Sequence, residues 1–159
     1  MSAVIAPFKR DAFSARPPLK HQIEAFGRTS GLETKDFDAE RFIGQIFEAY
    51  AVRLHRTGQP LGTRLDLVDV LPELAFVLQG ERFWTNPQRE NFHPYSRVQF
   101  AYDLGRLRRA GRLSHKGLRM SLGSATGGST KQKDRVLYLE DDRGSGQYYL
   151  SIRFAKDEI

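Results

Sequence analysis

The stretch "PYSRVQFAYDLGRLRRAGRLSHKGLRMSL", from Pro94 to Leu122, contains the change of period that decides the fold. Up to Ala110 the apolar residues recur with the spacing of a helix, and Gly111 is a typical residue just beyond a helix end. After Gly111 the period shortens to that of a strand. Because proline suits the first position of a helix, we predict a helix from Pro94 to about Ala110, followed by a strand.

Two more helices are predicted upstream. In the first, from Asp36 to the stop at Gly58 and Pro60, the apolar residues form one helical stripe. They are Ile43, Ile46, Phe47, Tyr50, Ala51 and Leu54. A second apolar stripe runs over residues 67–78 and closes at Gly80, although Pro72 lies within it. We therefore expect this helix to start late, with Asp69 as its cap and the proline in its first turn.

Strand patterns follow the third helix. "RLSHKGLRMSL" (112–122) and "RVLYLED" (135–141) are two predicted strands, separated by the Gly/Ser/Thr-rich loop "GSATGGSTKQKD" (123–134). "QYYLSIRF" (147–154) is a third strand after the turn "DDRGSG". The expected fold class is α+β, with three helices followed by a small antiparallel sheet that carries a Gly/Ser-rich loop.

The chain is expected to form one domain over residues 36–159, preceded by an arm. Residues 1–35 contain three prolines, carry a net charge of +3 and show no sustained period, so we predict a flexible basic arm. This arm either touches nucleic acid or is a terminus without a function. No cysteine, no signal peptide and no run of apolar residues long enough for a membrane span are present, which favours a cytoplasmic protein that does not contact membranes.

Positive charge is concentrated in one window. The chain has a formal charge of +6, yet residues 104–133 alone carry +8 with no acidic residue. A charge needed only for solubility would be spread with both signs interspersed, whereas a block of one sign attracts polyanions. The window therefore favours a nucleic-acid partner.

The third predicted helix has a polar face that could read DNA. At 100° per residue, Phe100, Leu104 and Leu107 fall on one side, and five hydrogen-bonding or stacking residues fall on the other. These are Tyr95, Gln99, Tyr102, Arg106 and Arg109. Arginine pairs with guanine and glutamine with adenine in the major groove. Cations beyond the helix would bind phosphates. These are Arg112, Lys116, Arg119, Lys131 and Lys133.

A different assignment of the same helix stays open. Tyr95 and Tyr102 could join Val98 in a second core stripe, while the arginines are solvated or paired with acids elsewhere. Basic surfaces also serve acidic proteins and anionic membranes.

The order of elements resembles the winged-helix family of DNA-binding domains over residues 36–154. The resemblance implies that the third helix enters the major groove and that the hairpin loop, the wing, contacts the backbone or minor groove. This chain departs from the family pattern in a longer link between the second and third helices and in an additional strand at the C-terminal end. Many winged helices act only as protein-interaction modules.

Catalytic and cofactor motifs are weak. In "GSATGGST" a serine stands where a phosphate-binding P-loop needs lysine, and no apolar helix follows. Asp66, Asp69 and Glu73 could hold a metal for nuclease chemistry, but they interleave with apolar residues as an exposed helix face does. The four histidines lack the spacing of zinc ligands. We expect no cofactor and no bound metal.

The sequence thus predicts a non-enzymatic protein that binds double-stranded DNA, in preference to RNA, in regulation or DNA maintenance. A homodimer is compatible with this hypothesis. The alternative is an adaptor subunit of a larger assembly, whose aromatic residues Phe83, Trp84 and Phe92 contact a protein partner. A small metal-dependent nuclease is the third hypothesis.

Overall fold

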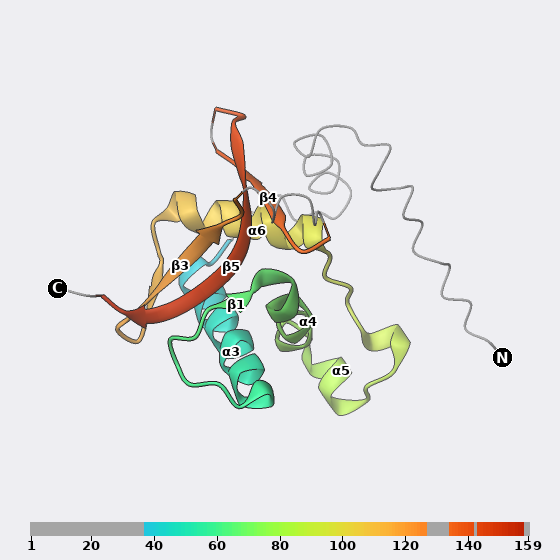
Figure 1. The fold of residues 1–159 in the computed structure, drawn as a ribbon. Coiled ribbons are helices and arrows are strands. Elements are labelled where there is room, and N and C mark those ends of the chain that lie inside the picture. Colours follow the sequence, from blue (N-terminus) through green and yellow to red (C-terminus); the bar gives the residue numbers. More distant parts are fainter. Residues whose placement is uncertain (1–36, 127–133, 142, 158–159) are drawn as a thin grey trace.

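The computed structural model describes residues 37–126, 134–141 and 143–157. The predicted arm and residues 127–133 of the predicted loop lie outside these ranges. Apart from the two-residue strand Leu65–Asp66, which lies between the first two helices, the helices of the described chain come first and the rest of a small antiparallel sheet follows (Figure 1). The elements are α3 (Ala39–Thr57), β1 (Leu65–Asp66), α4 (Leu67–Val77), α5 (Glu81–Thr85), the 3-10 turn η1 (Arg89–Asn91), α6 (Arg97–Ala110), β2 (Ser114–His115), β3 (Leu118–Ser124), β4 (Leu137–Glu140) and β5 (Gly146–Lys156). The predicted α+β class, with helices before the sheet, is confirmed at this level.

Helix α3 forms as its sequence predicts. The Asp38 side chain caps it by accepting a hydrogen bond from the Arg41 N–H at 3.0 Å, and Gly58 ends it with a left-handed φ of 66°. Four of the six predicted stripe residues are buried, with Ile46 and Tyr50 fully inaccessible, whereas Phe47 and Ala51 are half-buried.

Helix α4 corrects the predicted late start. The helix begins at Leu67, directly after β1, and Pro72 lies inside it. A proline at this position has no N–H for the carbonyl four residues earlier, which weakens the first turns. Leu67, Val70 and Leu74 are nevertheless completely buried, so packing of these three side chains outweighs the missing hydrogen bond.

Helix α6 starts three residues later than predicted. Ser96 is its N-cap and accepts a hydrogen bond from the Gln99 N–H at 3.2 Å, so Pro94 precedes the helix. Its end at Ala110, with Gly111 in the left-handed conformation, is as expected. The long link from α4 holds α5 and η1, two short helices that were not predicted.

The predicted strand over residues 112–122 is instead a tight hairpin. Strands β2 and β3 pair antiparallel, and Lys116 and Gly117 form the two-residue turn with φ values of 50° and 77°. Positive φ at both positions is what a tight hairpin turn requires, and glycine at the second position is its usual signature. The prediction was wrong because it assigned this glycine to a continuous strand.

The sheet has the order β1-β5-β3-β2, and β4 pairs with the other end of β5. Its register shifts between Gly123 and Ser124, where β5 contains an extra residue. This bulge keeps Tyr149 and Ile152 on the inner face although they lie three residues apart. Helices α3, α4 and α6 pack on that inner face, where Phe154 contacts Tyr50 and Phe47 at ring distances of 5.2 Å. Within the described residues, no helix is long and apolar enough to cross a bilayer.

The turn conformation of Lys116 yields a stability prediction. A non-glycine residue with φ near 50° is strained by contact between its Cβ and the backbone. Lys116→Gly should therefore raise the free energy of unfolding by about 0.5–1 kcal/mol. Urea denaturation measures this change, and a fall in stability would show that the turn is not the one described.

Candidate nucleic-acid interface

The carboxylate of Asp103 organises the polar side chains of α6. Asp103 and Gln99 are 5% and 3% exposed. Asp103 Oδ2 accepts hydrogen bonds from the Tyr95 hydroxyl at 2.7 Å and from Gln99 Nε2 at 3.0 Å, and its Oδ1 accepts from Arg106 Nη2 at 2.6 Å. A buried carboxylate needs such donors, because burial without them costs several kcal/mol. One buried network therefore holds three of the predicted DNA-reading residues.

Aromatic rings cover the guanidinium of Arg106. Its Cζ lies 4.3 Å from the centre of the Phe37 ring and 4.6 Å from that of Tyr102. Burial raises the pKa of Tyr95 far above its ordinary value, and the neighbouring Asp103 carboxylate raises it further. Tyr95 is therefore a neutral hydrogen-bond donor over the whole physiological pH range.

These contacts correct the predicted reading face. Tyr95, Gln99 and Arg106 point to Asp103, and Tyr102 stacks on Arg106, so only Arg109 of the five is exposed. The alternative assignment is closer to the structure, because Tyr95 packs against the core and Arg106 pairs with an acid, although Tyr102 is not among the residues packed against the core. The sequence contains an indication of this network. Asp103 lies four residues after Gln99 and three before Arg106, so the three side chains share one helix face.

Arg109 and the predicted phosphate-binding residues that the structure describes form an exposed group, which we call the basic edge. It runs from the last turn of α6 through the β2–β3 hairpin, and its predicted members are Arg109, Arg112, Lys116 and Arg119. Arg119 lies 3.9 Å from the Asp157 carboxylate, and both side chains are exposed, so this ion pair is weak. Lys131 and Lys133 lie outside the described residues.

Arg108 belongs to the basic edge although the predicted set omitted it. It is exposed, its Nη1 donates to the Tyr149 hydroxyl at 2.9 Å, and its Cζ lies 5.0 Å from the centre of the Tyr149 ring. The contact ties the end of α6 to β5. Helical spacing did not predict a role for Arg108, because this residue lies outside the predicted polar stripe.

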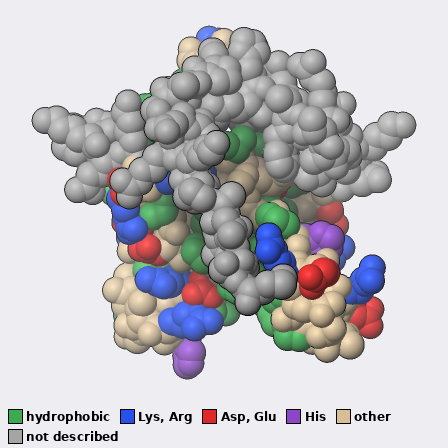
Figure 2. Space-filling view, turned by 90° about the vertical axis from the view of Figure 1, so that its right-hand side faces the viewer, with side chains coloured by type: hydrophobic (Ala, Val, Ile, Leu, Met, Phe, Trp, Pro, Cys, Tyr) green, Lys and Arg blue, Asp and Glu red, His purple; other side chains and the backbone are tan. Residues whose placement is uncertain are grey.

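The basic edge lies at the end of the molecule opposite to α5 (Figure 1). On the face that carries α5, the side chains that Figure 2 shows below the grey atoms include Lys and Arg next to Asp and Glu. The charges on that face are therefore mixed.

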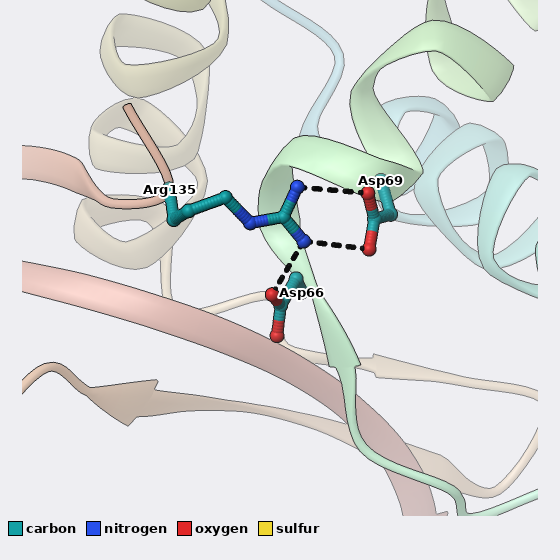
Figure 3. A network of polar contacts seen from close by, with 3 residues as sticks. All are labelled: Asp66, Asp69 and Arg135. Atoms are coloured by element: carbon teal, nitrogen blue, oxygen red, sulfur yellow. Dashed lines mark hydrogen bonds and ion pairs between the residues drawn. The ribbon is translucent and has the colours of Figure 1, made fainter. Parts of the chain in front are cut away.

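The acids considered for nuclease chemistry are engaged in ion pairs. Arg135 donates to Asp66 at 2.6 Å and to both oxygens of Asp69 at 2.9 and 3.3 Å (Figure 3). Hydrogen bonds to Asp69 and Asp66 raise the pKa of Arg135. Glu73 pairs with Arg56 at 2.9 Å. Among the residues that the structure describes, no group of three His, Cys, Asp or Glu side chains could hold a metal ion.

The aromatic residues proposed for a protein partner form a cluster with one more member, Phe76. Phe83 is buried and contacts Phe76, Trp84 and Phe92 at ring distances of 6.1, 5.3 and 5.7 Å. Trp84 is 60% exposed and Phe76 47% exposed, so the cluster presents an apolar surface.

Removal of the central carboxylate charge should destabilise the fold. Asp103→Asn leaves the partly buried Arg106 without its counter-charge, and we expect a loss of about 3 kcal/mol in the free energy of unfolding. The control, Asp157→Asn, removes an exposed charge and should cost less than about 0.5 kcal/mol. Chemical denaturation compares the two, and equal losses would contradict the network.

The Tyr95 hydroxyl should make stability fall at alkaline pH. An exposed tyrosine of the unfolded chain loses its proton near pH 10, whereas Tyr95 of the folded chain keeps it. Above about pH 10 the unfolded state then binds fewer protons, so the free energy of unfolding falls by up to about 1.4 kcal/mol per pH unit. Tyr95→Phe should lack this contribution. Urea unfolding at several pH values tests it, and identical pH slopes would refute it.

Known proteins supply no relative from which a role could be transferred. No family model, no curated protein and no solved structure matches this chain. Its function is therefore inferred from the arrangement of its own residues.

Proposed function

We propose that this protein binds double-stranded DNA, without catalytic turnover, through the basic edge. The observation that carries the proposal is the exposure of consecutive cations at the end of α6 and along the β2–β3 hairpin. No carboxylate of the described residues pairs with Arg112 or Lys116, and that of Asp157 lies 3.9 Å from Arg119. Such a surface attracts a polyphosphate.

The proposed contacts are to the phosphate backbone. Gln99 and Arg106, the side chains suited to base edges, are held by Asp103. The exposed arginines and lysine would neutralise phosphates and release counter-ions, which supplies affinity without reading sequence. Binding should therefore depend strongly on salt and weakly on base sequence.

The order of elements supports the proposal at a coarse level. Helices followed by a small antiparallel sheet are compatible with a winged-helix-like layout. In that interpretation, α6 is the third helix of the motif, and its C-terminal turn approaches the DNA together with the β2–β3 hairpin. A fold of this kind does not by itself imply DNA binding.

The test removes two charges of the basic edge. Arg112→Ala combined with Lys116→Gly should lower the affinity for a DNA duplex and reduce the slope of log K against log salt by about 0.9 for each phosphate that the variant no longer neutralises. The matched control, Arg82→Ala with Arg89→Ala, removes two exposed charges from α5 and η1. Fluorescence anisotropy with a labelled duplex at several salt concentrations measures both.

Two outcomes would contradict the proposal. One is an affinity of the native protein that does not change between low and moderate salt. The other is an equal loss of affinity in the control, since that would place the DNA elsewhere on the surface.

The second candidate function is that of an adaptor that binds a protein through the aromatic cluster. The exposed rings of Phe76 and Trp84, supported from beneath by Phe83, favour it. Aromatic side chains with this degree of exposure are typical anchors of protein interfaces.

The fluorescence of Trp84 separates the two functions, because it is the only tryptophan in the chain. Duplex DNA bound at the basic edge should leave its emission unchanged, since α5 lies at the opposite end of the molecule (Figure 1). A blue shift on addition of DNA would place the nucleic acid at the aromatic cluster and contradict the proposed interface.

A further inference from the structure

The outer face of the sheet carries two arginines on neighbouring strands. Leu65 pairs with Ile152 and both are buried in the core, so Arg153 points to the opposite face. The same register places Arg64, the residue before β1, beside Arg153. Ser121 of β3 lies opposite Arg153 on its other side. Two like charges in adjacent cross-strand positions are unfavourable unless an anion accompanies them.

Small residues shape the surface around these arginines. Arg64 Nη1 donates to the Ser151 hydroxyl at 3.2 Å and lies over Gly123. A Cβ at position 123 would collide with Ser151 Oγ and lie 2.7 Å from Arg64 Nη1. The absence of a side chain at Gly123 therefore lets the Arg64 guanidinium approach β3 closely.

Neither arginine has a carboxylate partner among the described residues. Asp66, two positions after Arg64 on the same face, is bound to Arg135. The Nε of Arg153 is buried and has no hydrogen-bond partner in the described part of the chain. A buried donor without a partner is unfavourable, and the described residues provide no acceptor for it.

The two charges act on the same region of the core. Burial raises the pKa of the Tyr50 hydroxyl, and the charges of Arg153 and Arg64 both oppose this rise. That hydroxyl donates to the Thr63 carbonyl at 2.6 Å, next to Arg64 in the chain. Both guanidinium charges therefore act on the same hydroxyl group.

We propose that Arg64 and Arg153, with the hydroxyls of Ser151 and Ser121, form a binding site for a phosphate group. Guanidinium groups present paired N–H donors that match the oxygens of a phosphate, and hydroxyls complete the coordination. The site lies on the outer face of the sheet, where Arg119 of the basic edge stands two residues before Ser121 in β3. Its phosphate belongs either to a nucleic-acid backbone or to a small phosphorylated molecule.

The first test uses the native full-length protein and inorganic phosphate. In a ¹⁵N-correlated NMR spectrum, the Arg153 Nε–H signal should shift and saturate as phosphate is added, whereas chloride at equal ionic strength should not reproduce the shift. Because no substitution is involved, the result does not depend on whether a variant folds. The absence of a saturable shift would overturn the proposal.

Variants then identify the ligand groups. Arg64→Ala should weaken phosphate binding about tenfold or more. Arg64→Lys, which keeps the charge and loses the paired donors, should bind with intermediate affinity. Arg89→Ala is the charge-matched control on η1 and should bind phosphate as the native protein does. Unchanged phosphate affinity in a folded Arg64→Ala protein would overturn the site.

Duplex DNA distinguishes the sources of the phosphate. If Arg64→Ala weakens binding of both inorganic phosphate and the duplex, the site takes a backbone phosphate. If it weakens inorganic phosphate alone, the ligand is a small phosphorylated molecule. Failure of DNA binding at the basic edge would leave the phosphate titration unaffected, so the two proposals can fail independently.

Discussion

The buried carboxylate of Asp103 is the interaction on which the surface presented by α6 depends. It lies on the inner side of the helix and draws Tyr95, Gln99 and Arg106 toward it, because a charge in that position is stable only when it is fully hydrogen-bonded. The polar stripe of α6 thus belongs to the protein interior. A helix that is amphipathic by sequence presents only its last turn as a charged surface.

The side chains that each face of the sheet presents depend on how the helices pack against it. Helices α3, α4 and α6 cover the inner face, and the bulge in β5 keeps Tyr149 on that face so that Arg108 can stack on its ring. This contact fixes the C-terminal turn of α6 against the sheet. The hairpin begins only a few residues later, so its exposed cations follow directly on those of the helix. The outer face, which has no helix from the described residues on it, carries Arg64 and Arg153.

Local sequence signals predicted much of the fold. Helix α3, the end of α6 at Gly111 and strands β4 and β5 have strong periodicity or clear stop residues. The start of α4 was missed because the burial of Leu67 and Val70 outweighs the proline that follows. The candidate site was harder to predict. Helical spacing places Gln99 and Arg109 on one stripe, but only tertiary packing decides that the first is buried and the second exposed. The pairing of Arg64 with Arg153 depends on a strand register between segments almost ninety residues apart, which no local pattern reveals.

Mapping of backbone amide shifts by NMR during titration with a short DNA duplex would locate the bound DNA on the protein. We expect the largest changes between Arg108 and Arg119, while the amides from Tyr95 to Asp103 stay close to their free positions. Changes centred on the first two turns of α6, with loss of the bond between Tyr95 and Asp103, would show that the helix opens to read DNA and would contradict the account.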